Sequence, residues 1–241
     1  MSWLKDRVIF ITGGASGLGR EIALQSAALG AKVAITDMHA ERLDATRADL
    51  ANVAGDCLAV RGDVTNEDDV AGAVREIIAR WGQLDTVVNS AGVYYYGPIV
   101  DTPMADFDRV YSVNVRGLYI VCREAARVML PNKSGHIVNI ASIAAERGIV
   151  GESVYSSSKW AVRGLGACLA QELGPEGIRV TTVFPGGMDT TFWENEPRMA
   201  SGEWNPANML RGEHVAEAVV QIASLPPKVV IKEALVYRPG V

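Results

Sequence analysis

Short apolar runs rich in β-branched residues alternate along this chain with segments of helical periodicity, and this alternation constrains the fold more than any other feature. The strand-like runs are Arg7–Thr12, Lys32–Asp37, Cys57–Asp63, Leu84–Ser90, His136–Ala141, Ile178–Phe184 and Ala234–Tyr237. The helical segments between them include Gly19–Leu29, Ala40–Leu50, Glu67–Trp81, Met104–Leu130 and Glu152–Leu173. Buried strands that alternate with helices predict an α/β fold: a doubly wound, seven-stranded parallel sheet of Rossmann type, with helices on both faces.

Size and composition fit one such domain over residues 1–241, because 49% of the residues are hydrophobic and 21% are charged. The net charge of -5 argues against a nucleic acid or an anionic membrane as partner. No apolar run approaches the ~18 residues of a membrane span, and the charged N-terminus lacks the apolar core of a secretory signal. Three cysteines without a C-x-x-C motif predict neither a disulfide framework nor a metal site, so we expect a cytoplasmic protein.

A glycine-rich turn follows the first predicted strand and opens directly into a helix: Thr12-Gly13-Gly14-Ala15-Ser16-Gly17-Leu18-Gly19. Glycines at such a turn let the backbone approach a pyrophosphate, whose charge is met by the first amides of the helix. The spacing is G-x-x-x-G-x-G rather than the common G-x-G-x-x-G, and the alternative is a plain tight turn. Its place in a βαβ unit favours dinucleotide binding.

Asp37 ends the second predicted strand and indicates which dinucleotide is bound. A carboxylate there can accept hydrogen bonds from the adenosine ribose, and it would repel a 2′-phosphate, which favours NAD over NADP. Alternatively Asp37 caps the following helix, and Arg20 or Arg42 can serve a phosphate. Asp63-Val64 and the turn Asn89-Ser90-Ala91-Gly92 end two further strands at the same predicted edge.

Tyr155 and Lys159 lie four residues apart in a helical segment, so they share one face of the helix. A free tyrosine has a pKa of ~10, too high for a base at neutral pH. An ammonium group ~4 Å away at an effective dielectric constant of ~20 is worth ~4 kcal/mol, which can lower that pKa by up to ~3 pH units. Ser142, at the end of the fifth predicted strand, can hold the substrate oxygen beside this pair.

With these motifs in this order, the chain resembles the short-chain dehydrogenase/reductase family, in its single-domain type. The resemblance covers nearly the whole chain and includes Asn114, Pro185-Gly186 and Thr190. It implies that Tyr155 is the acid/base, that Lys159 holds the nicotinamide ribose, and that Ser142 orients the substrate. It further implies that Asn114 holds a water of a proton relay, although from the sequence alone Asn114 reads as an ordinary polar helix residue. One departure is Ser90, where the family often has a second asparagine.

Asp37 makes NAD the expected cofactor, and the resemblance implies a homotetramer and a small molecule as substrate. Catalytic residues are expected to be Ser142, Tyr155, Lys159 and Asn114. Residues expected to bind the cofactor are Gly13, Ser16, Gly17, Leu18, Gly19, Asp37, Asp63, Val64, Asn89, Ala91, Gly92, Tyr155, Lys159, Pro185, Gly186, Met188 and Thr190.

A long segment after the sixth strand, about residues 187–210, is rich in large apolar side chains and is predicted to be a substrate lid. Further candidates for the substrate wall are Tyr94–Tyr96, Ala144–Arg147, Phe192, Trp193, Met199, Trp204 and Met209. Such a wall suits an apolar, fairly bulky secondary alcohol or ketone. The alternative is that these residues pack within their own domain or against a neighbouring subunit.

Two other functions compete with an NAD-dependent alcohol dehydrogenase. An NADPH-dependent 3-oxoacyl-carrier reductase is compatible with the resemblance but is disfavoured by Asp37. A non-catalytic dinucleotide sensor is disfavoured by the complete set of Ser142, Tyr155 and Lys159. A serine hydrolase is weaker still, because the chain lacks a G-x-S-x-G motif.

Overall fold

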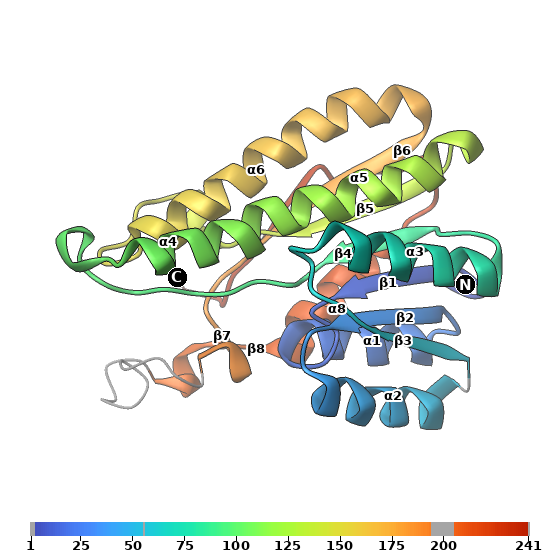
Figure 1. Cartoon of the computed structure of the whole chain (residues 1–241), viewed down its shortest axis with the longest axis horizontal. Coiled ribbons are helices and arrows are strands. Elements are labelled where there is room, and N and C mark those ends of the chain that lie inside the picture. The colour runs from blue at the N-terminus through green and yellow to red at the C-terminus, as the bar shows by residue number, and fades with distance from the viewer. Residues whose placement is uncertain (1–2, 55, 194–204, 241) are drawn as a thin grey trace.

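A seven-stranded parallel sheet forms the centre of the computed structural model, which describes residues 3–54, 56–193 and 205–240 (Figure 1). The strand order is β3-β2-β1-β4-β5-β6-β9, and every neighbouring pair is parallel. The strands are β1 (Val8–Thr12), β2 (Lys32–Asp37), β3 (Cys57–Arg61), β4 (Thr86–Asn89), β5 (Gly135–Ile140), β6 (Ile178–Pro185) and β9 (Glu233–Val236). The predicted doubly wound fold is confirmed.

Helices cover both faces of the sheet. They are α1 (Gly17–Ala28), α2 (Ala40–Ala54), α3 (Glu67–Trp81), α4 (Met104–Tyr111), α5 (Leu118–Met129), α6 (Ser153–Leu173) and α8 (Gly212–Ala223). Helices α1, α2 and α8 lie on one face, and α3, α4, α5 and α6 lie on the other (Figure 1). Helix α8 was missing from the predicted helices. The predicted helix Met104–Leu130 is divided, because a π-helical stretch, Ser112–Gly117, separates α4 from α5.

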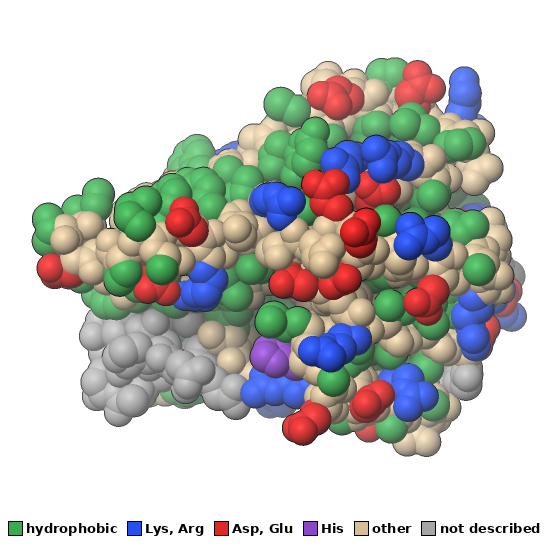
Figure 2. Space-filling model, viewed as in Figure 1, with side chains coloured by type: hydrophobic (Ala, Val, Ile, Leu, Met, Phe, Trp, Pro, Cys, Tyr) green, Lys and Arg blue, Asp and Glu red, His purple; other side chains and the backbone are tan. Residues whose placement is uncertain are grey.

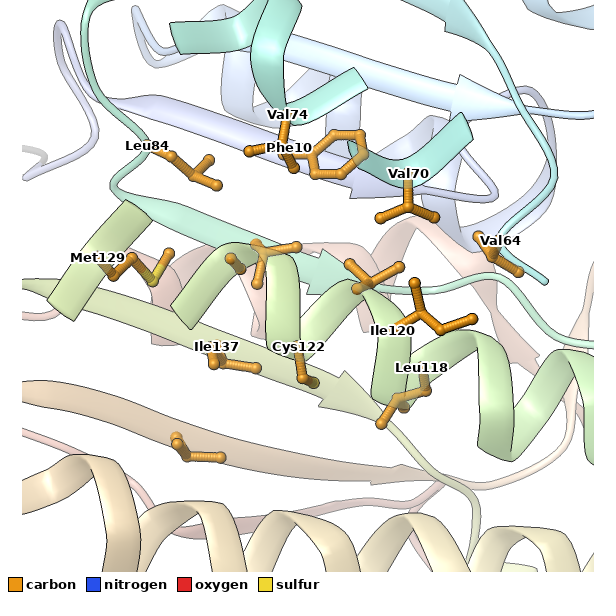
Figure 3. Close-up of a cluster of buried hydrophobic side chains, with 14 of the residues drawn as sticks. Phe10, Val64, Val70, Val74, Leu84, Leu118, Ile120, Cys122, Met129 and Ile137 are labelled. Carbon is orange, nitrogen blue, oxygen red and sulfur yellow. The ribbon is translucent and has the colours of Figure 1, made fainter. Parts of the chain in front are cut away.

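Alternate residues of the central strand β1 pack into two separate hydrophobic cores. Phe10 faces α3 and α5 (Figure 3), whereas Ile9 and Ile11 face α1 and α8. All five residues of β1 are buried. Because both faces of the strand are covered, its sequence reads as a continuous apolar run without polar alternation.

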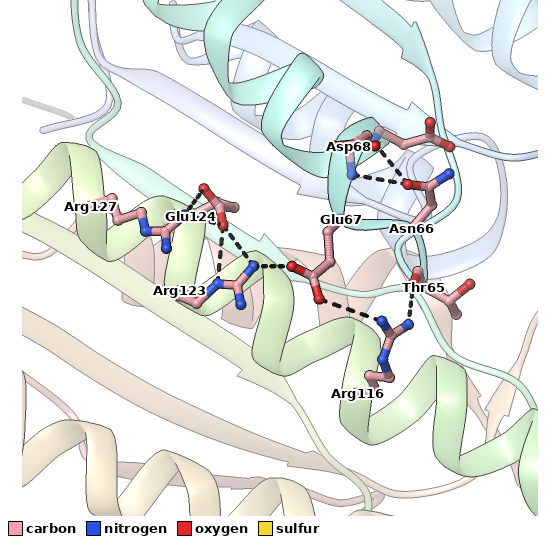
Figure 4. Close-up of polar contacts among 9 residues, drawn as sticks. Thr65, Asn66, Glu67, Asp68, Arg116, Arg123, Glu124 and Arg127 are labelled. Atoms are coloured by element: carbon pink, nitrogen blue, oxygen red, sulfur yellow. Dashed lines mark hydrogen bonds and ion pairs between the residues drawn. The ribbon is translucent and has the colours of Figure 1, made fainter.

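Helix α3 begins with a polar cap that also joins it to the π-helical stretch (Figure 4). The Asn66 side chain accepts hydrogen bonds from the amides of Asp68 and Asp69, and thereby satisfies two of the free donors at the helix start. Glu67 then pairs with Arg123 of α5 at 2.6 Å and with Arg116 of the π-helical stretch at 3.5 Å. These contacts fix α3 against the helices that carry part of the candidate site.

The predicted lid begins and ends in two short paired strands. Strand β7 (Met188–Asp189) pairs in parallel with β8 (Leu210–Arg211). The middle of the segment, which contains Met199 and Trp204, lies outside the described residues, as does the side chain of Trp193.

Candidate active site

A cleft of about 1010 Å³ lies along the carboxyl ends of the central strands. Its lining comes from the turns after β1, β2, β3, β4, β5 and β6, and from the segment that carries β7. This is the edge at which parallel α/β sheets bind their ligands. Every residue predicted to bind the cofactor lines this cleft except Asn89.

The glycine-rich turn at the start of α1 is shaped so that only glycines fit. Gly13 has a φ of +65°, and a Cβ atom there would lie 2.9 Å from the Cα atom of Ala91. A Cβ atom on Gly19 would lie 2.2 Å from the carbonyl oxygen of Gly13. Neither distance allows a side chain, so the turn presents bare backbone and the N-terminus of α1 to the cleft. Those features fit the pyrophosphate of a dinucleotide.

Asp37 lies at the end of β2 and lines the same part of the cleft, together with His39 and Arg42. One carboxylate oxygen accepts a hydrogen bond from the amide of Ala15 at 3.3 Å, and the other accepts one from the amide of His39 at 3.0 Å. Asp37 therefore orders both the glycine-rich turn and the approach to α2, while it remains on the surface of the cleft. Asp37 thus accepts a hydrogen bond from the amide just before α2, and the residue also lines the cleft.

Asn89 is the one predicted cofactor residue whose side chain points away from the cleft. Its Nδ2 atom donates to Oδ1 of Asn139 at 2.8 Å and to the sulfur of Cys122 at 3.2 Å, inside the protein. Successive strand residues face opposite sides of a sheet. The residues after the end of β4, Ser90, Ala91 and Gly92, reach the cleft instead.

Ser142, Tyr155 and Lys159 meet in the middle of the cleft, where the last residues of β5 approach α6. Lys159 is only 5% exposed, and its ammonium group donates to the carbonyl oxygen of Ile140 at 3.1 Å. Tyr155 is 6% exposed. The Lys159 nitrogen lies 5.6 Å from the centroid of the Tyr155 ring. The helical spacing and the strand end therefore bring together the three residues that the sequence analysis selected.

Burial shifts the pKa values of both residues toward their neutral forms. The pKa of Lys159 falls to about 8. The pKa of Tyr155 is raised, first by burial and then by the negative charge of Glu152, whereas a hydrogen bond with Ser142 lowers it. The expected lowering of the Tyr155 pKa by Lys159 is therefore not what this structure shows. Burial disfavours the phenolate more strongly than its neighbours favour it.

Asn114 lies in the π-helical stretch and is 1% exposed. Its Oδ1 atom accepts from the amide of Val93 at 2.8 Å, and its Nδ2 atom donates to the carbonyl oxygen of Val93 at 2.9 Å and to Ser158 at 3.1 Å. The side chain thus joins the turn after β4 to α6, next to Lys159. π-Helical bulges often mark functional sites.

The substrate end of the cleft is formed by a mainly apolar group that includes Tyr94, Tyr95, Tyr96, Ile143, Ile149 and Phe192. The predicted wall Ala144–Arg147 is wrong, because Ala144 and Ala145 are buried in the core and the cleft is lined by Ile143 and Ile149 instead.

Sequence analysis missed Glu152, a carboxylate that lines this end. Its position three residues before Tyr155, on the same helical face, was the signal that could have identified it.

Known proteins match this chain over nearly its whole length. A family model described as short chain dehydrogenase matches residues 7–201. (+)-Borneol dehydrogenase 2 of Salvia officinalis is 39% identical over 243 residues, which cover 92% of this chain and 84% of that protein. The crystal structure of levodione reductase has a TM-score of 0.87 and 32% identity and covers 96% of each chain. A metagenomic short-chain oxidoreductase in complex with NADP has a TM-score of 0.84 and 28% identity and covers 98% of each chain.

Candidate membrane spans and metal-binding groups are both absent from the described residues. These residues contain no helix of the length and hydrophobicity that a bilayer crossing requires. The same part of the chain contains no group of three or more His, Cys, Asp or Glu side chains arranged to hold a metal ion.

Proposed function

Because this chain belongs to the short-chain dehydrogenase family, we propose that it is an NAD-dependent oxidoreductase acting on a secondary alcohol or ketone that is mainly apolar and fairly bulky. The observation that carries the proposal is the group formed by Ser142 with the buried Tyr155 and Lys159, placed between a cradle of glycines and an aromatic pocket. A screen of alcohols and ketones with NAD(H) and NADP(H), followed by nicotinamide absorbance, tests it. The absence of turnover with every pair would contradict it.

In the proposed reaction, the carbinol carbon loses a hydride and the hydroxyl group loses a proton. The bound nicotinamide supplies the hydride chemistry. Tyr155 exchanges the proton with the substrate oxygen, while Ser142 holds that oxygen. Burial keeps the Tyr155 phenol protonated in the protein alone, because it raises the Tyr155 pKa. This state suits the protonation of a ketone.

Lys159 has a second role in the proposed site, because its ammonium group can bind the nicotinamide ribose. Its contact with the Ile140 carbonyl fixes the ammonium group at the end of β5. Asn114 acts as a positioning residue, because it holds the backbone of Val93 against α6.

The preference for NAD is supported by the carboxylate of Asp37 in the cleft, although the solved structure of one relative contains NADP. We expect the wild type to bind NADH more tightly than NADPH. Asp37→Ala is expected to reduce the ratio of the NADPH and NADH dissociation constants, which we call the gap, by about tenfold or more. The substitution removes both an acceptor for the ribose and the repulsion of a 2′-phosphate. Titration of both cofactors into both proteins measures the gap.

A second substitution separates charge from loop geometry. Asp37→Asn removes the charge but keeps one side-chain oxygen, so it can retain one of the two hydrogen bonds, with the amide of Ala15 or of His39. It is expected to reduce the preference for NADH and to disturb the turn less than Asp37→Ala does. Asp44→Ala, on an exposed position of α2, is the control and should leave the gap as in the wild type. Equal or tighter binding of NADPH by the wild type would rule out the NAD assignment.

We also propose that residues 187–210 close over the bound substrate. Phe192 supports this role, because its ring centroid lies 6.0 Å from that of Tyr94 and 6.1 Å from that of Tyr155, although the residue is 37% exposed. Hydrogen exchange of amides in this segment is expected to slow several-fold when cofactor and a substrate analogue are added together. Complete protection in the protein alone would instead indicate a fixed structural element.

We propose that the protein is a cytoplasmic homotetramer. The cytoplasmic location is supported by the free thiols of Cys57, Cys122 and Cys168. Association is supported by exposed aromatic residues on the outer helices, Tyr119 of α5 at 50% and Trp160 of α6 at 47%. Acidic and basic side chains are interspersed over the face seen in Figure 2, unlike the continuous basic surface that nucleic acids require.

A further inference from the structure

Glu152 is a buried carboxylate at the substrate end of the cleft. It immediately precedes α6, is 3% exposed, and lines the cleft three residues before Tyr155. Its Oε1 atom accepts a hydrogen bond from the hydroxyl of Tyr94 at 2.7 Å. Tyr155, in the first turn of α6, lines the same cleft, so the carboxylate and the phenol border the same space.

Tyr94 fixes the position of this carboxylate relative to the reacting group. The Tyr94 ring packs edge-on against the Tyr155 ring, with centroids 4.8 Å apart, while its hydroxyl holds Glu152. One aromatic side chain therefore contacts both residues. The negative charge of Glu152 in turn contributes to the raised pKa of Tyr155, after the larger effect of burial.

Glu152 is a charged residue among mainly apolar neighbours. Neighbouring lining residues at this end include Ile143, Ile149 and Phe192. Among the described lining residues here, Arg109 is the other charged group, but its side chain is 46% exposed and pairs with Asp106 at 3.0 Å. Besides Lys159, which lies beside Tyr155, Glu152 is thus the buried charged residue that a substrate meets at this end of the described lining.

A carboxylate in such a place favours particular substrates. Burial of an ionised carboxylate is costly unless hydrogen-bond donors surround it. A carboxylate offers about four acceptor positions, so it can accept a hydrogen bond from a substrate as well as from protein donors such as the Tyr94 hydroxyl. An apolar substrate displaces water from the carboxylate without replacing its hydrogen bonds, and an anionic substrate is repelled.

We propose that Glu152 is a specificity-determining residue, which selects secondary alcohols and ketones that carry a hydrogen-bond donor, a hydroxyl or an ammonium group, on the carbon next to the reacting carbon. Glu152 accepts the hydrogen bond of this second group, while Tyr155 exchanges a proton with the reacting oxygen. The apolar body of the substrate packs against Phe192 and its neighbours. This inference rests on the proposed function and narrows its substrate class.

The test compares three alcohols with the same aromatic body: 1-phenylethanol, 1-phenylethane-1,2-diol and 2-amino-1-phenylethanol. The wild type is expected to have the higher kcat/KM for the two compounds that carry a donor. Glu152→Gln is expected to reduce the preference for the diol over 1-phenylethanol by about 10- to 100-fold, because a charge-assisted hydrogen bond is lost. The preference for the amino alcohol should fall further, since the attraction between opposite charges is lost too. These two arms distinguish a hydroxyl from an ammonium ligand.

The chain offers a matched control for this substitution. Glu146 also accepts a hydrogen bond from a tyrosine hydroxyl, that of Tyr237, but it does not line the cleft. Glu146→Gln is therefore expected to keep the wild-type ratios among the three alcohols. An unchanged ratio in Glu152→Gln, or a wild type that prefers 1-phenylethanol, would overturn the proposal.

Equilibrium binding separates this inference from the proposed function. Calorimetric titration of the same compounds into the enzyme–NAD complex reports the preference even when no turnover occurs. Wild-type protein that binds the diol more tightly than 1-phenylethanol, with a gap that shrinks in Glu152→Gln, would support the role of Glu152 independently of the reaction. The wild type also permits a test without any substitution, because 2-hydroxy-2-phenylacetate, with a carboxylate in place of the donor, should bind most weakly. Tighter binding of this anion than of the diol would contradict the proposal.

Discussion

Replacement of Tyr155 by phenylalanine is expected to lower kcat by at least ~100-fold while the affinity for the cofactor changes only a few-fold. The loss follows because the phenolic hydroxyl is the group that exchanges a proton with the substrate, and general acid/base groups contribute ~10²–10⁴-fold. The cofactor site is spared because its glycine-rich turn and Asp37 lie at the other end of the cleft. Nicotinamide absorbance gives kcat, and fluorescence titration gives the dissociation constant of NADH.

Lys159→Met provides the contrast to this variant. Its side chain fills a similar volume, but it removes the ammonium group that lies near the Tyr155 ring and can hold the ribose. Both kcat and cofactor affinity are therefore expected to fall. Near-normal turnover in Tyr155→Phe would show that another group carries the proton. Unchanged cofactor affinity in Lys159→Met would show that Lys159 does not bind the nicotinamide ribose.

The stability of the protein is expected to fall steeply between pH 6.5 and pH 3 because of His136. This residue is fully buried in β5, where its Nε2 atom is 2.8 Å from the hydroxyl oxygen of Thr181. Burial, aided by the charge of Arg179, lowers its pKa from 6.5 to about 3. Above pH 6.5 the imidazole is neutral in both the folded and the unfolded chain. Below it, only the unfolded chain takes up the proton, so stability is lost until the pH reaches the folded pKa.

The expected loss from this residue is about 1.4 kcal/mol of unfolding free energy per pH unit, and on the order of 4–5 kcal/mol in total. Urea unfolding at several pH values measures it. His136→Gln is expected to be less stable than the wild type at pH 7.5, because its bond to Thr181 is altered, but to lose less stability on acidification. His214→Gln, at an exposed position of α8, controls for the loss of an imidazole. Equal pH slopes in His136→Gln and the wild type would refute the role of His136.

Local sequence patterns predicted the sheet, the glycine-rich turn and the central residues of the proposed active site. The central strands, such as β1 and β5, were recognisable because they are buried on both faces and read as apolar runs. The glycines at positions 13 and 19 were recognisable because the backbone there approaches other backbone too closely for any side chain. Tyr155 and Lys159 were recognisable because four residues in a helix place two side chains on one face. All three signals depend on residues that are close together in the chain.

The tertiary structure decided the features that depend on residues far apart in the chain. Asn89 faces Asn139, 50 residues away, because the strand register directs it inward. Glu152 belongs to the substrate end because Tyr94, 58 residues earlier, holds it there. The pKa of Tyr155 is raised rather than lowered, because several distant segments together exclude water from its phenol. Burial sums contributions from the whole fold, so neither spacing nor residue type within one segment can specify it.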